Sequence, residues 1–152
     1  YKFRTTINEL EFPNLIDYIS ICKHYNKEAI LEIKNEVKES DAIRIVEEII
    51  SLGWLDHTTI ISFCMNNLLN IRKHYKDVKL QFLTGEFNDD LLKVLADNNL
   101  SLDYYFGNLT KEIVDKMHSF NLVVNCWTVD KEEDAYRLID MGVDMITSNI
   151  LE

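Results

Sequence analysis

The chain of 152 residues contains one proline and four glycines. This scarcity of turn residues argues against a β-sandwich, which needs many tight turns. No apolar run approaches the roughly 18 residues that a membrane-spanning helix requires. The three cysteines lie far apart and form no Cys-x-x-Cys pair, so neither a zinc site nor a redox motif is indicated.

Positive charge is also scarce, because sixteen basic residues stand against twenty-six acidic ones, for a formal net charge of -10. A nucleic-acid backbone would be repelled by most of such a surface, so we expect no nucleic-acid partner. Glycine-rich phosphate loops of the Walker and Rossmann types are missing too, which leaves nucleotide binding unsupported. With 47% hydrophobic residues, the chain can bury a single core, and we expect one domain over residues 1–152.

Short apolar segments alternate with longer stretches of helical period along the whole chain. The pattern predicts strands at residues 28–34, 58–63, 79–84, 100–104, 122–128 and 143–148. Between and before them it predicts helices at residues 15–25, 40–52, 66–75, 89–98, 110–120 and 131–141. Ser40 is expected to cap the second helix, and Gly53 and Gly142 suit helix ends in the left-handed conformation.

Such alternation predicts an α/β protein with a parallel sheet, because each right-handed crossover returns the chain to the same edge direction. Two architectures satisfy it: a doubly wound open sheet and a piece of a (β/α)8 barrel. In both, functional residues lie at the carboxyl ends of the strands.

The first predicted strand carries two charges on one face. Period-two alternation places Ile30, Glu32 and Lys34 together, opposite an apolar face. A carboxylate inside a barrel needs a cation. Either Lys34 is that partner in a structural ion pair, or Glu32 binds a metal or substrate at the mouth of the strand while Lys34 meets an anionic substrate oxygen.

The fifth predicted strand places Val123, Asn125 and Trp127 on one face. The indole is either part of the core or a flat apolar wall for a small polyol beside Asn125. For the second predicted strand, the sequence does not decide which face points inward. Ser62 on that strand has no His-Asp partner at a recognisable spacing, which disfavours nucleophilic catalysis.

In order along the chain, several segments resemble the glycerophosphodiester phosphodiesterase family. Residues 12–18 look like its Pro-Thr-Leu-Glu-Glu helix start, and residues 29–34 look like its Glu-Leu-Lys strand. Its later strands are matched by residues 61–63, 82–85, 102–104, 124–129 and 142–147. The resemblance implies an incomplete (β/α)8 TIM barrel that holds about the last six βα units of eight.

The resemblance also implies a site. Glu32 corresponds to a ligand of a divalent cation, Ca2+ or Mg2+, Lys34 to a basic residue beside the phosphate, and Trp127 to a residue of the glycerol pocket, with Phe63 and Asn125 as further substrate-binding positions. The family's His-Arg-Gly and His-Asp motifs do not occur, so no catalytic acid or base is identified. Two Glu-x-Asp matches, at residues 39–41 and 132–134, do not follow the right strand, and residues 4–6 resemble the tail of the missing region.

We therefore expect a portion of a phosphodiesterase that releases glycerol 3-phosphate and an alcohol from glycerophosphodiesters. The portion alone should be inactive, and a missing N-terminal part of the barrel or a second chain should complete it. An alternative is a non-catalytic barrel module that binds a polyol phosphate. A response-regulator-like domain is a third possibility, but its acidic pair and its lysine are absent. A cytoplasmic location is expected ahead of a secreted or membrane-attached one.

Overall fold

Helices and strands alternate through residues 13–151, which are the residues that the computed structural model describes. The helices are α1 (Leu15–His24), α2 (Glu39–Ser51), α3 (Met65–His74), α4 (Asp89–Asp97), α5 (Lys111–Ser119) and α6 (Glu132–Asp140). The strands are β1 (Ala29–Glu32), β2 (Thr58–Ser62), β3 (Lys79–Thr84), β4 (Ser101–Tyr105), β5 (Val124–Trp127) and β6 (Met145–Ile146). Two 3-10 helices, η1 (Leu55–His57) and η2 (Phe106–Asn108), complete the list.

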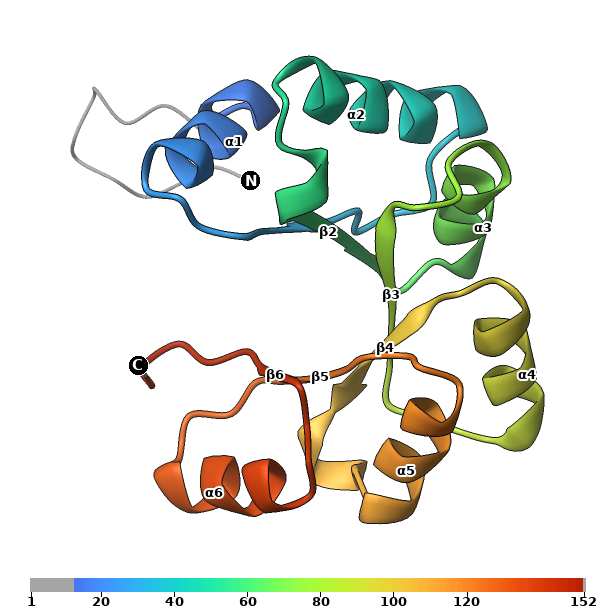
Figure 1. Ribbon diagram of the computed structural model, residues 1–152, viewed down its shortest axis with the longest axis vertical. Helices are drawn as coiled ribbons and strands as arrows, with labels where there is room; N and C mark the ends of the chain where they lie inside the picture. Colours follow the sequence, from blue (N-terminus) through green and yellow to red (C-terminus); the bar gives the residue numbers. More distant parts are fainter. Residues whose placement is uncertain (1–12, 152) are drawn as a thin grey trace.

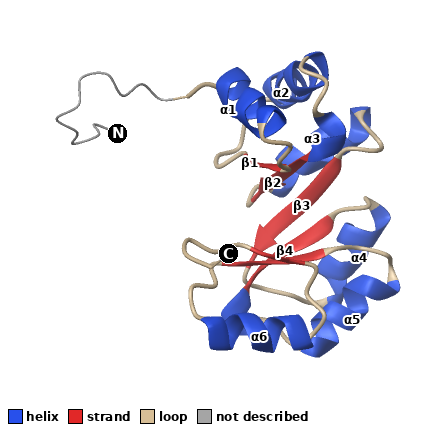
Figure 2. Cartoon of the chain, turned by 60° about the vertical axis from the view of Figure 1, so that its left-hand side comes forward, coloured by secondary structure: helices blue, strands red, loops and turns tan. Residues whose placement is uncertain are grey.

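The six strands form one parallel sheet in the order β1-β2-β3-β4-β5-β6. Each strand therefore pairs with its neighbours in the chain, whereas a doubly wound sheet reverses its strand order at a switch point. The sheet curls with the helices outside it (Figures 1 and 2). This confirms the incomplete (β/α)8 barrel and excludes the doubly wound alternative.

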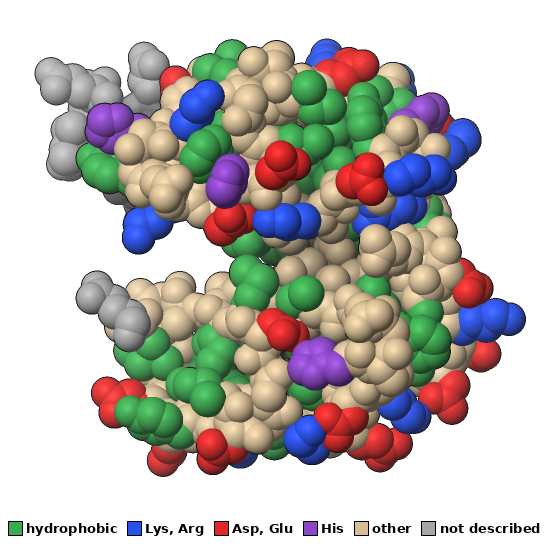
Figure 3. All heavy atoms as spheres, in the orientation of Figure 1, with side chains coloured by type: hydrophobic (Ala, Val, Ile, Leu, Met, Phe, Trp, Pro, Cys, Tyr) green, Lys and Arg blue, Asp and Glu red, His purple; other side chains and the backbone are tan. Residues whose placement is uncertain are grey.

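The ring of helices is open between α1 and α6 (Figure 1). The space-filling view shows the same opening as a deep hollow that runs toward the inner face of the sheet (Figure 3). Strands β1 and β6 are the two edges of the sheet. None of the helices within residues 13–151 is both long and apolar enough to cross a bilayer.

Two faces of the sheet differ in chemistry. The outer face carries apolar side chains that pack under the helices, such as Leu80, Leu102 and Val124, which are at most 2% exposed. The inner face alternates with it and carries polar groups, among them Gln81 and Asn125. The period-two pattern of each strand therefore separates the packing core from the barrel interior.

Most helices return to the sheet through a residue in the left-handed conformation. Gly53 and Gly142 have φ of +63° and +85°, as their sequence positions predict. Asparagine takes this role at three further turns, with φ between 49° and 57°, at Asn26, Asn99 and Asn121. Asparagine tolerates this conformation better than most other residues, which explains how a chain with four glycines builds so many of these turns.

Two helix starts illustrate which local signals are reliable. Asn14 caps α1 and forms a capping box with Asp17, in which each backbone N–H donates to the other side chain. The prediction that Ser40 caps α2 is wrong, because the helix begins at Glu39 and Lys38 is its N-cap without a side-chain hydrogen bond. Glu39 and Asp41 lie in the first turn, where carboxylates interact favourably with the helix dipole.

One buried cation, Arg72, lies in the last turn of α3. Arg72 is 7% exposed and donates hydrogen bonds to five backbone carbonyl groups. The acceptors are the carbonyl oxygens of Tyr75, Lys76, Val78, Asn98 and Asn99. Since a guanidinium carries five N–H groups, every donor is used, and the side chain joins the turns before β3 and β4.

Candidate active site

Glu32 is the last residue of β1, and Lys34 follows in the loop before α2. The Lys34 Nζ atom lies 3.0 Å from Glu32 Oε2. The Glu32 side chain is 27% exposed, whereas that of Lys34 is 77% exposed. The structure therefore brings the two predicted site residues together as an ion pair at the carboxyl end of the strand, with the ammonium on the solvent side.

Three aromatic side chains gather at the carboxyl ends of β2, β4 and β5. We call Phe63, Tyr105 and Trp127 the aromatic cluster. The ring centroids of Phe63 and Trp127 lie 5.6 Å apart in an edge-to-face arrangement, and those of Tyr105 and Trp127 lie 5.6 Å apart with tilted planes. Phe63 and Tyr105 remain 49% and 40% exposed. The cluster is thus an apolar wall that stays accessible to a ligand.

The indole of Trp127 is held in place, because its Nε1–H donates to the backbone carbonyl oxygen of Asp103 at 3.3 Å. Tyr105 is a member of the cluster that the sequence analysis missed. Tyr105 could have been identified from the period-two alternation that places Ser101, Asp103 and Tyr105 on one face of β4. The same kind of alternation identified Trp127 on β5.

Asn125 lies deeper in the barrel than the aromatic cluster and is 2% exposed. Its Nδ2 donates to Gln81 Oε1 at 3.4 Å, and its Oδ1 accepts a hydrogen bond from the backbone N–H of Cys126 at 2.8 Å. Gln81 in turn approaches the sulfur of Met145 at 3.7 Å. Asn125 therefore belongs to a polar network across the interior, and a substrate contact by its side chain stays a prediction.

Ser62 is buried on the outer face of β2. Its Oγ donates to the carbonyl oxygen of Ile33 at 2.7 Å and accepts hydrogen bonds from Asn67 and from the backbone N–H of Cys64. These bonds tie the loop after β1 to the start of α3. The hydroxyl is part of the scaffold, consistent with the low expectation for a nucleophilic serine.

Asp103 is the functional candidate that the sequence analysis missed entirely. It lies on the inner face of β4, is 1% exposed, and its Oδ1 has no hydrogen-bond partner among residues 13–151. Burial raises the pKa of this carboxyl to about 7, and the negative charge of Glu32 adds to the effect.

The family resemblance implies a divalent cation, for which the carboxylate of Glu32 is a suitable ligand. Ca2+ and Mg2+ prefer carboxylate oxygens, and the buried Oδ1 of Asp103 is an acceptor that no donor within residues 13–151 meets. In the part of the chain that the structure describes, no three His, Cys, Asp or Glu side chains form a ligand group. Since such a cation takes about six or more oxygens, water, substrate or residues outside this part would have to complete its coordination.

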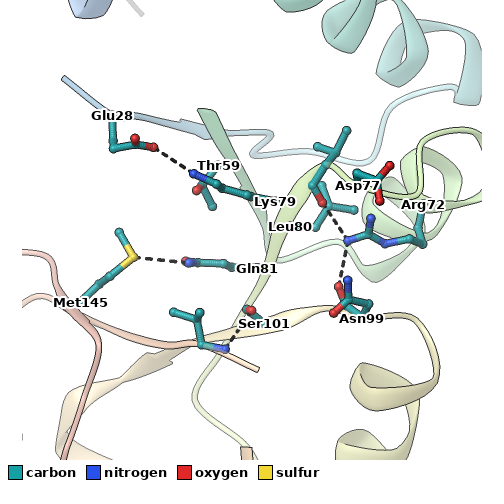
Figure 4. A pocket seen from close by; sticks show the side chains of 12 residues that line it. Glu28, Thr59, Arg72, Asp77, Lys79, Leu80, Gln81, Asn99, Ser101 and Met145 are labelled. Atoms are coloured by element: carbon teal, nitrogen blue, oxygen red, sulfur yellow. Dashed lines mark hydrogen bonds and ion pairs between the residues drawn. The ribbon is translucent and has the colours of Figure 1, made fainter. Parts of the chain in front are cut away.

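A cavity of about 390 Å3 opens at the other end of the strands (Figure 4). Glu28 and Lys79 face each other across it with 3.3 Å between Oε2 and Nζ, and hydrogen bonds from His57 and Lys79 lower the pKa of Glu28. Gln81 and Met145 line its inner part. Because barrel enzymes work at the carboxyl ends of their strands, this cavity is better described as the amino-terminal part of the open barrel interior.

This chain has a curled parallel sheet with polar side chains inside and a charged pair at the carboxyl ends of the strands. These features place it in the class of (β/α)8 barrels with a site at the strand ends. The chain belongs to the glycerophosphoryl diester phosphodiesterase family, whose sequence model matches residues 2–152. No curated protein matches this chain.

Solved structures agree with this fold. A glycerophosphodiester phosphodiesterase from Parabacteroides distasonis is 24% identical with a TM-score of 0.74, and the match covers 90% of this chain and 60% of that one. A phosphodiesterase from Oleispira antarctica, in complex with the product sn-glycerol-3-phosphate, is 16% identical with a TM-score of 0.73, covering 90% and 57%. The chain thus spans about 60% of the length of these relatives.

Proposed function

We propose that this chain is the portion of a phosphodiesterase that binds the phosphate and glycerol parts of a glycerophosphodiester, which the complete enzyme hydrolyses to glycerol 3-phosphate and an alcohol. The observation that carries this proposal is the Glu32–Lys34 pair at 3.0 Å at the carboxyl edge of a barrel of this family. The Oleispira relative, which was solved with sn-glycerol-3-phosphate, supports the substrate class.

Each group has a role that its chemistry favours. The exposed ammonium of Lys34 attracts a phosphate oxygen, and the aromatic cluster gives the carbon atoms of a glycerol unit an apolar surface. Glu32, together with residues outside this chain, holds a divalent cation. When bound, such a cation supplies positive charge that neutralises phosphate oxygens as the phosphodiester reacts.

The His-Arg-Gly and His-Asp motifs, which the family resemblance associates with proton transfer, do not occur in this sequence. The four histidines of the chain lie on helices or in η1, and none follows the carboxyl end of a strand. We therefore expect that the chain alone gives no turnover and that a further barrel segment, on the same polypeptide or on a second chain, provides the acid and base.

The test is the release of glycerol 3-phosphate by the complete enzyme with Glu32→Gln, which keeps the shape and removes the charge. We expect a loss of at least 100-fold, typical of removing a group that acts on the transition state. Glu47→Gln on the exposed side of α2 is the control. Unchanged turnover in Glu32→Gln would contradict the role of Glu32.

A non-catalytic module that binds a polyol phosphate is the second candidate, and the lack of a histidine at the strand ends favours it. Binding of sn-glycerol-3-phosphate, measured by calorimetry in parallel with hydrolysis, separates the two. Binding without hydrolysis by the complete protein supports the module, and hydrolysis supports the enzyme.

A further inference from the structure

Gly107 lies in η2, two residues after Tyr105 of the aromatic cluster. Its φ is outside the left-handed region, so the backbone does not require glycine here, in contrast to Gly53 and Gly142. A neighbouring side chain does. A Cβ atom at position 107 would lie 2.6 Å from Cε1, 2.9 Å from Cζ and 3.0 Å from the hydroxyl oxygen of Tyr105. The phenol ring therefore rests directly on the backbone of Gly107.

The backbone around Gly107 is anchored, whereas the ring is free to move. Leu109, directly after η2, is 3% exposed and belongs to the core. The Asn108 side chain donates a hydrogen bond to the carbonyl oxygen of Gly85 at 3.0 Å, which ties η2 to the loop after β3. Tyr105 is 40% exposed. A side chain at position 107 would therefore displace the Tyr105 ring rather than the turn beneath it.

The place that the ring occupies is the one that completes the aromatic cluster. Trp127 is held by its own hydrogen bond to the backbone of Asp103, and Phe63 meets it edge to face. Tyr105 meets Trp127 with 5.6 Å between the ring centroids, and a half-exposed tyrosine has other staggered rotamers available. The open space at Gly107 thus decides which rotamer Tyr105 adopts.

We propose that Gly107 is a positioning residue of the aromatic cluster, whose missing side chain keeps the Tyr105 ring beside Trp127 as part of the wall for a glycerol unit. This inference rests on the proposed function, since the wall is the surface that the glycerol part of the substrate would meet. Gly107 acts through Tyr105 and not by a contact of its own.

The first experiment measures the Kd of the complete protein for sn-glycerol-3-phosphate by calorimetry. We expect Gly107→Ala to weaken binding by about 3- to 10-fold, which corresponds to the loss of one aromatic contact. Gly85→Ala is the matched control, because a Cβ atom there would meet Cβ of Tyr105 at 3.6 Å, an ordinary van der Waals distance. The control should bind as tightly as the native protein.

A double-mutant cycle shows whether Gly107 acts through the ring. Tyr105→Ala alone should weaken binding by a similar factor. In that background Gly107→Ala should have no further effect, because the ring that the new methyl group would displace is gone. Equal weakening by Gly107→Ala with and without Tyr105 would mean that the turn itself is disturbed, and would overturn the inference.

Tryptophan fluorescence provides a readout that needs no ligand. Gly107→Ala and Tyr105→Ala should both shift the emission of Trp127 to longer wavelength, because withdrawal of the ring exposes the indole to water. Gly85→Ala should leave the emission unchanged. Trp54, the other tryptophan, lies before β2 at the opposite ends of the strands and is common to all variants. Gly107→Ala is expected to fold, since the displaced atoms are the far end of an exposed side chain.

The outcomes separate this inference from the proposed function. If the native protein binds sn-glycerol-3-phosphate and Gly107→Ala changes neither the Kd nor the emission, the inference is overturned and the function stands. A shifted emission with an unchanged Kd would also overturn it, because the ring would then be no part of the glycerol wall. If the native protein neither binds sn-glycerol-3-phosphate nor hydrolyses a glycerophosphodiester, the proposed function fails, and the emission alone decides whether Gly107 positions Tyr105.

Discussion

Two buried charges in this molecule have opposite surroundings. Arg72 is 7% exposed and all its N–H groups donate to backbone carbonyl oxygens, whereas Asp103 is 1% exposed and its Oδ1 accepts no hydrogen bond from the described residues. The first lies in the last turn of α3 and bonds to the turns before β3 and β4, and the second lies on the inner face of β4. The contrast teaches that a buried charge with every bond satisfied belongs to the scaffold, and one without partners points to a ligand.

The largest effect is expected for Arg72→Met. The methionine preserves much of the side-chain volume and leaves five carbonyl groups without their donor, so we expect the free energy of unfolding to fall by roughly 3–5 kcal/mol. Urea denaturation followed by circular dichroism measures it. Arg44→Met is the control, because Arg44 is 77% exposed and reaches Asp41 only at 3.8 Å. If the free energy of unfolding fell equally in both variants, the buried hydrogen bonds of Arg72 would not be what stabilises the fold.

The second effect concerns pH. Below about pH 4 the carboxyl group of Asp103 is protonated in both folded and unfolded chains, so its burial carries no charge penalty. Between pH 4 and about 7 the unfolded chain releases this proton while the folded chain keeps it. The free energy of unfolding therefore contains a contribution that declines as pH rises through this window, by roughly 2–4 kcal/mol in cation-free buffer.

Asp103→Asn should abolish that decline and make the chain more stable than the native protein at pH 8. Denaturation curves at pH 5 and pH 8 measure the difference, with Asp97→Asn as the reference for the loss of one negative charge. A variant that keeps the native pH dependence would show that another group titrates in this window.

A smaller effect is expected at the aromatic cluster. Trp127→Leu removes the hydrogen bond to the backbone of Asp103 and the ring contacts with Phe63 and Tyr105. The free energy of unfolding should therefore fall by about 1–2 kcal/mol. The KM for a glycerophosphodiester in the complete enzyme should rise as well. Tyr136→Leu on α6 is the control, since Tyr136 is 66% exposed and should change neither quantity.

The smallest effect on stability is expected for Lys34→Met. An ion pair with one partner 77% exposed contributes about 1 kcal/mol or less to folding. The KM should nevertheless rise, because the ammonium that we propose as the phosphate contact is gone. Lys131→Met, another exposed lysine with a long contact to Glu133, provides the comparison. A large loss of stability with an unchanged KM would make Lys34 a scaffold residue.

Much of the fold was predictable because hydrophobic periodicity records which face of each element is buried. The strand predicted at residues 79–84 coincides with β3, and the others differ mainly at their ends. The strand predicted over residues 143–148 is reduced to Met145 and Ile146, the two residues that pair with β5. Residues 4–6 and Phe12, on which part of the resemblance rested, lie outside the described residues.

The site was only partly predictable. Glu32 and Lys34 were found because alternation within one strand decides which side chains share a face. Asp103 was missed because its significance depends on burial, on the absence of a donor and on the charge of Glu32 three strands away. Local sequence carries none of these facts, since they arise only when the sheet curls.

The left-handed turns that return most helices to the sheet suggest how this architecture tolerates change. These connections, at Asn26, Gly53, Asn99, Asn121 and Gly142, depend on one backbone conformation each, which leaves little freedom to lengthen them. Within residues 13–151, the loops on the opposite rim contain no residue in the left-handed conformation. Insertions that diversify ligand preference would therefore accumulate on that rim, and engineers who graft new recognition loops should place them after the strands and keep the asparagine turns intact.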